Sequence, residues 1–300
     1  MSDGRYDVKV NERTHMVVDR STGRYLGAAG ANFYDAWVFP LYTPSVRTVV
    51  REFPFDHPFH NGFFVGQHPV QVGERVGNFW AHPPTRGWDD HIFVNVGRVD
   101  APKEPEVDVG DDGVRFTFRN VWRDEHDGPL IDEVRTVTFR SAEGATVCDM
   151  TSEKVAAYGA VEYPQTKFGS IGVRVEPRLL PPLGGTVIAD AGRRGNAEIT
   201  HEGESDFVAY ETAGPVVPTQ FAKEGKPQPV PKERAFGVLL HILDEGVRGP
   251  WFIRDYGMAM YNPTWTGSIS TAAGGSWTVG LRVVAYDGEL TEERAREWLT

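Results

Sequence analysis

The chain has 300 residues, of which 40% are hydrophobic, and a formal net charge of −11. This charge argues against a nucleic-acid partner or an anionic membrane surface, because both require a basic face on the protein. Cys148 is the only cysteine, which excludes an internal disulfide and a cysteine metal cluster. The length is compatible with one large β domain, and we predict a single domain over residues 1–300.

The N-terminal segment 1–7 lacks the apolar run of a signal peptide, and no stretch approaches the ~20 apolar residues that span a bilayer. We therefore expect a cytoplasmic protein with no membrane partner. The 33 glycines and 21 prolines are more than average, and no segment has low complexity. This composition is typical of many short strands joined by tight turns.

Alternation of apolar and polar residues is the commonest pattern along the chain. It occurs at 114–118 and, after a turn at 127–129, again at 136–140. Each run places one face on a core and one in water, which predicts an antiparallel pair. In chain order, the other predicted strands are 14–19, 47–53, 91–99, 146–151, 170–176, 186–190, 206–211, 235–243, 251–261 and 276–285.

One helix is predicted, at the C-terminus, where Thr291 caps a segment with two glutamates in its first turn. Strands and helices do not alternate, which argues against a parallel α/β sheet. We therefore predict an all-β fold, a large antiparallel β-sandwich with a short C-terminal helix. The proline-rich loop 213–234 is either a lid over a cleft or a surface excursion without a role, and the irregular stretch 81–90 is a second candidate to cover a cleft.

Five of the nine histidines fall between residues 57 and 91: His57, His60, His68, His82 and His91. Prolines at 54 and 58 argue against a helix, so His57 and His60 are expected on a loop or strand end. Two imidazoles placed this way can ligate a metal or carry protons near neutral pH. The alternative is that they pack on aromatic rings and bond loop backbone. The candidate ligands for a divalent metal ion are His57, His60, His82 and His91.

Two further groups of ionisable residues lie later in the chain. Glu162 and Lys167 flank a turn, and they form either one side of a concave site or an ordinary surface ion pair. Arg254 and Asp255 follow each other in a predicted strand and therefore point to opposite faces. One of them faces inward and needs a partner, either in a site or in a structural buried ion pair.

The order of these segments resembles the bacterial PmoA-like family, a family of uncertain function often labelled "methane oxygenase PmoA". The similarity runs from about Tyr34 to Trp298 and rests on Asp-His-Pro-x-His-x-Gly at 56–62, Phe-Trp-x-His at 79–82, Thr-Lys-x-Gly at 166–169, Arg-Asp-Tyr-Gly at 254–257 and Asn-Pro at 262–263. The chain departs from the family pattern at Phe59, Asn61 and Gln165. The resemblance therefore implies related chemistry with a different ligand or weaker catalysis.

The resemblance implies a galactose-mutarotase-like supersandwich, whose relatives bind sugars on a concave sheet and move protons with histidine and carboxylate pairs. The oxygenase label has no support in the residues, because no membrane-spanning segment is present. We expect a carbohydrate-processing enzyme, an epimerase, mutarotase-like enzyme or lyase that acts on a small sugar or sugar derivative. The alternatives are a non-catalytic carbohydrate-binding accessory protein and a cupin-like metal-dependent oxygenase.

In this hypothesis, His57, His60, Glu162 and Lys167 are the catalytic residues, the first three as acid or base groups and Lys167 as a stabiliser of negative charge. The substrate-binding candidates are Asp56, Asn61, Trp80, His82, Trp88, Arg254, Tyr256 and Asn262. We expect the two histidines, Lys167 and Arg254 to converge on one cleft, because unpaired charges are costly inside apolar strands.

Overall fold

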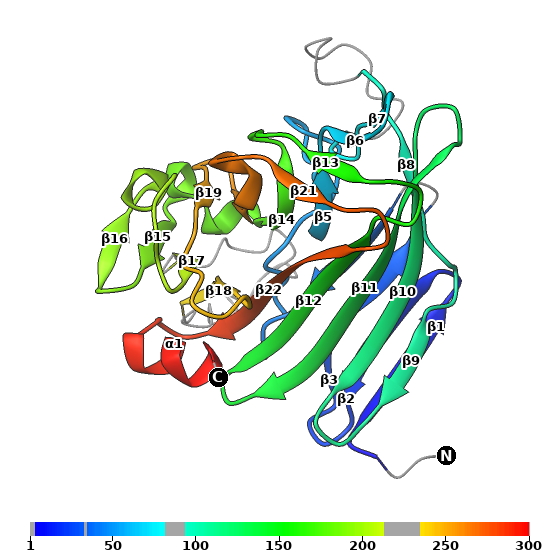
Figure 1. Ribbon diagram of the computed structural model, residues 1–300. Coiled ribbons are helices and arrows are strands. Elements are labelled where there is room, and N and C mark those ends of the chain that lie inside the picture. The colour runs from blue at the N-terminus through cyan, green and yellow to red at the C-terminus, as the bar shows by residue number, and fades with distance from the viewer. Residues whose placement is uncertain (1–3, 33–34, 82–93, 213–234, 300) are drawn as a thin grey trace, which may run out of the picture.

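Two large antiparallel sheets, packed on each other, form the body of the protein (Figure 1). The computed structural model describes residues 4–32, 35–81, 94–212 and 235–299. Strands make up 52% of the structure and helices 8%, as expected for the predicted all-β sandwich with a short C-terminal helix. No helix in these ranges has the length and apolar character needed to cross a membrane.

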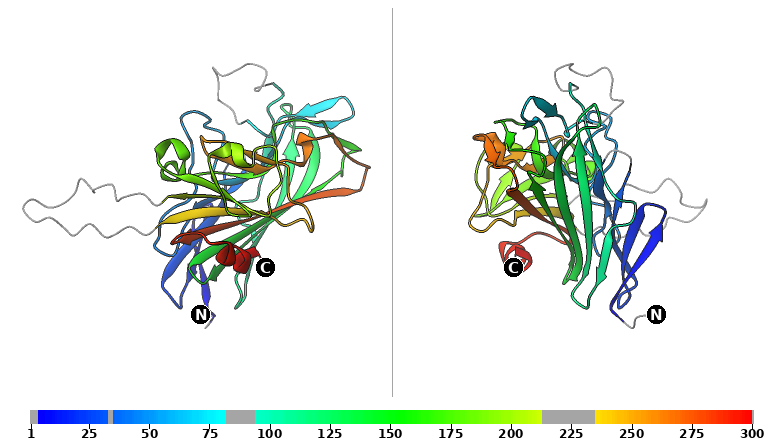
Figure 2. Two further views of the ribbon diagram at one scale, coloured as in Figure 1. Left: turned by 90° about the vertical axis from the view of Figure 1, so that its left-hand side faces the viewer. Right: turned by 45° about the vertical axis from the view of Figure 1, so that its right-hand side comes forward.

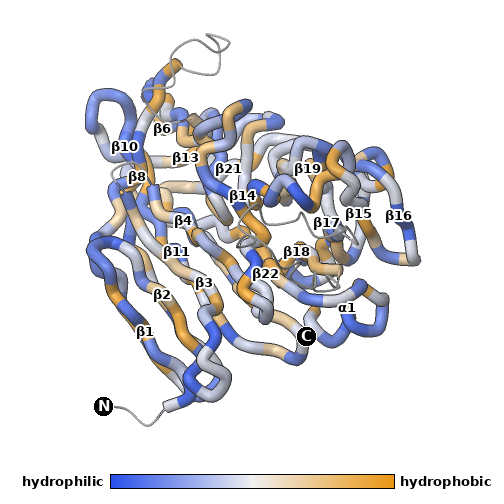
Figure 3. The backbone as a smooth tube through the Cα atoms, turned by 180° about the vertical axis from the view of Figure 1, so that it is seen from behind, coloured by the Kyte–Doolittle hydropathy of each residue, from blue (hydrophilic) through white to orange (hydrophobic). Residues whose placement is uncertain are grey.

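The first sheet has eight strands and carries the candidate functional site described below. Its strands, in spatial order, are β1 (Tyr6–Asn11), β2 (Thr14–Asp19), β3 (Arg24–Ala31), β4 (Ala36–Leu41), β5 (Phe63–Gln67), β14 (Gly169–Arg174), β20 (Met258–Tyr261) and β19 (Trp251–Ile253). The order β5–β14–β20 brings segments together that lie far apart in the sequence. Hydrophobic and hydrophilic positions are interspersed along β1, β2 and β3 (Figure 3).

The second sheet has ten strands and contains the longest ones. These are β16 (Arg193–Gly195), β15 (Thr186–Ala189), β17 (Val208–Thr212), β18 (Phe236–Ile242), β22 (Ser276–Asp287), β12 (Ala145–Val155), β11 (Pro129–Ala142), β10 (Val114–Arg123), β8 (Arg98–Asp100) and, also paired with β10, β9 (Glu106–Val109). A small third sheet contains β21 (Ile269–Thr271), β13 (Val161–Tyr163), β6 (Val70–Val72) and β7 (Arg75–Gly77).

The predicted alternating pair is confirmed by β10 and β11. In the antiparallel register, Val114 lies opposite Phe139 and Phe116 lies opposite Val137. All four side chains are buried, whereas the intervening residues are more exposed. The period of two therefore set both the pairing face and the core face.

Three strand predictions need correction. In the described part of the predicted strand 91–99, only Arg98 and Val99 belong to a strand, which is β8. The segment 47–53 forms only isolated bridges, one of them between Val50 and Val175. The predicted strand 251–261 is a hairpin of β19 and β20, because the chain turns at 254–257. Gly257 makes this turn with a φ of +88°, a conformation that side-chain-bearing residues rarely adopt.

The main core lies between the two large sheets, and its buried residues run from Tyr6 near the N-terminus to Ala285 in β22. Figure 2 shows the strands β1–β4 on one side of this layer and the long strands β10–β12 on the other. Both halves of the chain thus contribute to the same apolar interior, which the burial of apolar area stabilises.

The helix α1 (Glu292–Leu299) confirms the C-terminal prediction. The backbone N–H of Arg294 donates to Oγ1 of Thr291 at 3.3 Å, which is a side-chain cap. Ala295 and Trp298 are buried in a second apolar cluster with Tyr286 of β22. Four single-turn 3₁₀ helices complete the described elements: η2 (Pro177–Leu179), η3 (Pro181–Leu183), η4 (Ala197–Ile199) and η5 (Pro263–Trp265).

Candidate functional site

A cavity of about 440 Å³ lies on the outer face of the eight-stranded sheet, away from the main core. It is lined by His57, Phe59, His60, Trp80, Lys167, Phe168, Phe252, Arg254 and Tyr256. The alternation along β19 explains its position. Trp251 and Ile253 point into the main core, whereas Phe252 points to the opposite face and joins an aromatic cluster there.

Glycines keep this part of the sheet free of side chains that would fill the outer face. Gly172 of β14 lies beside Met260 of β20, and a Cβ atom at residue 172 would come within 2.3 Å of the Met260 Cβ. Gly62, which ends the histidine segment, has a φ of +59°, and a Cβ there would lie 2.2 Å from the carbonyl oxygen of Val38. Larger residues at either position would push the histidine segment or β20 away from the sheet.

Two consecutive turns present the histidines to the cavity. The N–H of His57 donates to the carbonyl of Pro54 at 3.1 Å, and the N–H of His60 donates to the carbonyl of His57 at 3.0 Å. The segment is fixed to the end of β14, since the N–H of Arg174 donates to the carbonyl of Gly62 at 2.8 Å. The loop position predicted from the prolines is therefore confirmed.

Lys167 is positioned by Asn262. The Asn262 Nδ2 donates to the carbonyl of Thr166 at 2.9 Å, and its Oδ1 accepts from the N–H of Thr264 at 3.1 Å. The Thr166 N–H in turn donates to the Thr264 carbonyl at 2.9 Å. Asn262 thus holds the 166–168 turn on η5 and places the lysine at the cavity, rather than lining the cavity itself.

The turn between β19 and β20 places Arg254 and Tyr256. The N–H of Arg254 donates to the carbonyl of Met258, and the N–H of Gly257 donates to that of Arg254, both at 2.9 Å. From the ten-stranded sheet, the hydroxyl of the buried Tyr210 donates to the same Arg254 carbonyl at 2.8 Å. The turn is therefore anchored from both sheets.

Asp56 and His57 form a hydrogen-bonded pair at the cavity, with 2.9 Å between Oδ2 and Nδ1. Asp56 also accepts from Nη2 of Arg174 and from Nη2 of Arg51, the latter at 3.3 Å. Burial alone would raise the pKa of Asp56, but the bonds from Arg174 and His57 outweigh it and lower the pKa to about 2. An ionised Asp56 accepts a hydrogen bond from Nδ1–H of His57, which leaves Nε2 as the nitrogen of the neutral imidazole that can accept a proton.

The two histidines belong to a stack of parallel rings. Tyr256 and His57 have ring centroids 5.1 Å apart, His57 and His60 are 4.9 Å apart, and the planes deviate by only 10° and 6°. Phe64 continues the stack at 5.9 Å, and Trp80 meets the His60 ring edge-on at 4.9 Å. This packing fixes the ring planes, and it gives the cavity a rigid aromatic wall.

Two cations complete the lining. The Lys167 Nζ lies 5.1 Å from the ring centroid of Phe168, and the Arg254 guanidinium lies 4.7 Å from that of Phe252. In the part of the chain that the structure describes, neither cation forms an ion pair with a carboxylate. Both contacts are of the cation–π type, which leaves the charges able to meet a ligand.

The family of the chain is decided by a match over residues 15–300 to the model described as "Family of unknown function (DUF6807)". The protein belongs to the DUF6807 family. The description of this family names no function and gives no support to the PmoA-like label expected from the sequence motifs. No curated protein matches the chain.

The solved structures that match this DUF6807 member share little sequence with it. A galactose mutarotase-like protein from Lactobacillus casei ATCC 334 is 9% identical, with a TM-score of 0.37, over 94% of this chain and all of the other. A galactose mutarotase related enzyme from Lactobacillus acidophilus is 10% identical, with a TM-score of 0.28, over 95% and 100%. A variant of the α-galactosidase AgaA from Geobacillus stearothermophilus, in complex with stachyose, is 11% identical, with a TM-score of 0.37, over 94% and 40%. These similarities are too low to assign an activity to the family member.

The residues predicted from the sequence fall into three groups in this DUF6807 protein. His57, His60, Lys167 and Arg254 line one cavity, as expected, together with Trp80 and Tyr256. Asp56, Asn61 and Asn262 instead bond protein groups, and the Asn61 Oδ1 accepts from the N–H of Phe53 at 2.8 Å. His82, Trp88, His91 and the loop 213–234 lie outside the described residues, as does most of the irregular stretch 81–90.

Glu162 is placed elsewhere, although only a short turn separates it from Lys167. It belongs to β13 of the small third sheet and lines a different cavity of about 360 Å³ with Ser270 and Gln71. The Ser270 hydroxyl donates to its carboxylate. The period of two buries Val161 and Tyr163 and turns Glu162 away from them. The ion pair weighed for Glu162 and Lys167 is not formed.

Sequence reasoning missed the roles of Arg51 and Phe252. Arg51 bonds Asp56, and Phe252 carries the guanidinium of Arg254. The signal for Phe252 was present, because it alternates with Trp251 and Ile253 and must face away from their core. No comparable pattern marks Arg51. Among the described residues, no group of three histidine, cysteine, aspartate or glutamate side chains is arranged to hold a metal ion.

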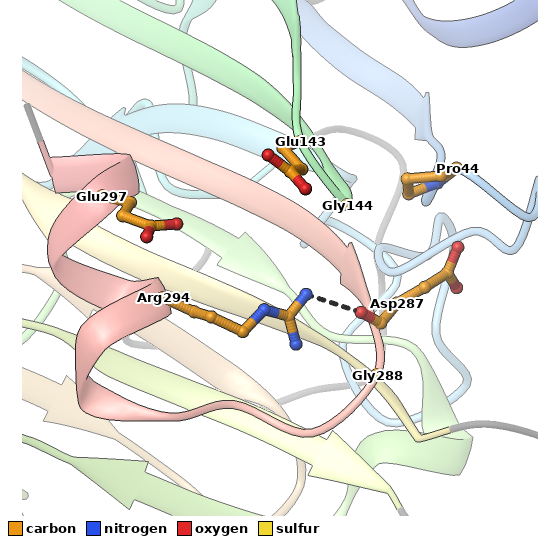
Figure 4. Close-up of a pocket in the computed structure, with 7 residues that line it drawn as sticks. All are labelled: Pro44, Glu143, Gly144, Asp287, Gly288, Arg294 and Glu297. Atoms are coloured by element: carbon orange, nitrogen blue, oxygen red, sulfur yellow. Dashed lines mark hydrogen bonds between the residues drawn. The ribbon is translucent and has the colours of Figure 1, made fainter.

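A third cavity of about 540 Å³ lies near the C-terminal helix and has a different character (Figure 4). It is lined by Pro44, Glu143, Gly144, Asp287, Gly288, Arg294 and Glu297. Arg294 of α1 donates to the Asp287 backbone carbonyl at 2.8 Å, and the Asp287 carboxylate accepts from the N–H and hydroxyl of Ser45, both at 2.7 Å. These contacts tie α1 and the 43–47 turn to the end of β22, which is a structural role.

Proposed function

We propose that this protein is an enzyme that transfers a proton on a small sugar or sugar derivative, as an epimerase or lyase, in the cavity next to Asp56 and His57. The observation that carries the proposal is the Asp56–His57 pair, which lies beside two cations that have no carboxylate partner in the described structure. A base next to stabilisers of negative charge is the arrangement that proton abstraction requires.

In the proposed step, the Nε2 of His57 removes a proton from a carbon atom next to a carbonyl or carboxyl group. The electron pair of the broken C–H bond forms a C=C bond to the carbonyl carbon, and negative charge develops on the oxygen. Lys167 and Arg254 stabilise this charge. Delivery of a proton from water to the opposite face, with release of the His57 proton to solvent, gives the epimer. In a lyase, a β-oxygen substituent instead departs with its bonding electrons and takes up the His57 proton, which gives the unsaturated product.

The cavity suits a sugar in size and in lining. Its volume of about 440 Å³ lies within the range of small-molecule sites, roughly 300–1,000 Å³. Trp80 and Phe168 offer apolar surface to the faces of a sugar ring. His57 and the two cations offer hydrogen-bonding groups to hydroxyl groups, whereas both ring nitrogens of His60 are buried.

A second candidate function is carbohydrate binding without turnover. The parallel stack of Tyr256, His57 and His60 favours this alternative. A histidine in such a stack can form part of the apolar wall of a binding site without acting as a base. The two functions differ in one measurable respect. Only an enzyme exchanges a carbon-bound proton of its ligand with solvent.

The test is incubation of the purified protein in D₂O with a panel of hexoses, ketohexoses and hexuronates, followed by mass spectrometry and NMR of each sugar. We expect deuterium at a carbon next to the carbonyl or carboxyl group. His57→Gln should reduce the exchange rate by about 10²–10⁴-fold. His126→Gln is the matched control, because this side chain is 84% exposed and lies away from the cavity.

Sugar binding by the wild type with no exchange in any member of the panel would favour the accessory function. Equal exchange by the wild type and His57→Gln, with unchanged melting temperatures, would remove His57 from the mechanism.

A further inference from the structure

The described lining of the cavity carries positive charge although the protein is strongly acidic. The chain has 42 acidic and 31 basic residues, yet the described cavity lining contains Lys167, Arg254 and two histidines but no aspartate or glutamate. Elsewhere on the described surface, arginines pair with carboxylates, as Arg248 does with Asp190 and Asp206. The lining therefore differs in charge from the rest of the molecule.

The carboxylate that contacts the lining does not neutralise the two cavity cations. Asp56 accepts from Arg174 and Arg51 as well as from His57, so its single negative charge faces two guanidinium groups. Arg174 is buried, with its guanidinium 4.7 Å from the ring centroid of Tyr256. Its Nε and Nη1 atoms have no hydrogen-bond partner among the described residues. The guanidinium of Arg174 thus adds a positive charge beneath the aromatic wall, whereas Arg51 also faces the carboxylate of Glu176.

Lys167 is exposed and Arg254 is half-buried, so an anion that enters the cavity can meet both cations and form charge-assisted hydrogen bonds with them. We propose that the substrate carries a carboxylate, which Lys167 and Arg254 bind, and that it is a sugar acid of the uronate type. This inference rests on the proposed function and specifies its substrate class.

The chemistry of the proposed step favours a carboxylate over a phosphate. When the His57 Nε2 takes the proton from the carbon next to a carboxylate, the C–H electron pair moves into a C=C bond and a second negative charge develops on the carboxylate oxygens. The two cations then face the atoms where charge increases, which is where stabilisation accelerates the step. A phosphate ester on a sugar hydroxyl takes up none of the negative charge that develops in this step. Cations that bind the phosphate would therefore lie away from the atoms where that charge develops.

The test is isothermal titration of the full chain with D-glucuronate and D-galacturonate, with their methyl esters, and with D-glucose and D-galactose. We expect at least one uronate to bind about 10-fold or more tightly than its methyl ester, which has the same ring without the charge. Lys167→Met and Arg254→Met should each weaken that uronate about 10-fold or more and leave the methyl ester within 2-fold. Lys9→Met is the matched control, because its Nζ lies over the Tyr25 ring at 5.5 Å, away from the cavity.

Equal affinity for uronate and ester, absence of binding by both uronates, or unchanged uronate affinity in both cavity variants would overturn the inference. Tighter binding of glucose 6-phosphate than of either uronate would overturn it in favour of a phosphate site. Failure here is distinguishable from failure of the proposed function. Uronate binding without deuterium exchange keeps the carboxylate site and removes the proton transfer, whereas exchange on neutral sugars alone keeps the proton transfer and removes the carboxylate site.

Discussion

Two regions of this protein place a lysine beside aromatic rings, and the charge has a different environment in each. Lys154 of β12 lies between the two sheets, with its side chain buried and its Nζ 4.6 Å from the ring centroid of Trp277. Lys167 lies at the outer cavity, on an exposed turn, above Phe168. The interior lysine has a carboxylate directly opposite it in the sheet register, Glu133, and the cavity lysine pairs with no described carboxylate.

The interior carboxylate is the centre of a network with several donors. Glu133 accepts from both Nε and Nη2 of Arg135 at 2.9 Å, from Nε1 of Trp122 at 2.7 Å and from Nδ2 of Asn120 at 2.9 Å. Arg135 also donates to Asp35 at 2.9 Å and to the carbonyl of Ala36, where β4 begins. The network therefore links the ten-stranded sheet to the eight-stranded one.

The difference indicates which charges support the fold and which serve a ligand. Glu133 and Arg135 are paired with each other inside the protein, where an unpaired charge costs several kcal/mol. Lys154 has the charge of Glu133 opposite it, although its Nζ forms no hydrogen bond to a described residue. Cavity charges lack such partners and are exposed enough to remain hydrated until a ligand arrives. Three substitutions test this distinction through stability.

The largest effect is expected from Glu133→Gln. Loss of the carboxylate charge leaves Arg135 and Lys154 buried with too little negative charge, which should lower the free energy of unfolding by about 3–5 kcal/mol. Urea unfolding, monitored by tryptophan fluorescence, measures this free energy of unfolding. Glu153→Gln on β12, a partly exposed glutamate opposite Val134, is the control and should change stability by no more than about 0.5 kcal/mol. A Glu133 variant as stable as this control would mean that the interior network is dispensable.

A smaller, pH-dependent effect is expected from Lys154→Met. Burial lowers the pKa of Lys154 from 10.5 to about 7, and the charge of Glu133 only partly opposes it. At pH values between about 7 and 10.5, Lys154 holds a proton in the unfolded chain that it has lost in the folded protein. The free energy of unfolding should therefore rise with pH, by up to about 1.4 kcal/mol per unit.

The measurement is urea unfolding at pH 7.0 and 8.5. Lys154→Met should lack the rise of about 1–2 kcal/mol that the wild type shows between these values, and Lys9→Met, which removes an exposed charge, should retain it. Identical slopes in the wild type and Lys154→Met would show that Lys154 is not the titrating group.

The smallest effect on stability is expected from Lys167→Met. An exposed lysine without an ion pair contributes little, so the free energy of unfolding should change by less than about 0.5 kcal/mol. The same variant should lose most of its uronate affinity. A loss of stability above about 2 kcal/mol would show that Lys167 supports the fold, and would contradict the distinction between interior charges and cavity charges.

Several features of this protein were determined by the sequence alone. The alternation at 114–118 and 136–140 fixed the β10–β11 pair and its core face, because side chains of a strand alternate between its two faces. Thr291 and the glutamates after it fixed the start of α1. The prolines at 54 and 58 placed His57 and His60 on turns. Each of these features depends on interactions within a few residues or between neighbouring strands.

The tertiary structure alone decided which ionisable residues meet. Glu162 and Lys167 are close in sequence but line different cavities, because β13 joins the small sheet while Asn262 holds the turn at Lys167. His57 and Tyr256 are distant in sequence but stack, because β5, β14 and β20 lie side by side. Strand order depends on the packing of the whole chain, and a local period of two carries no information about it.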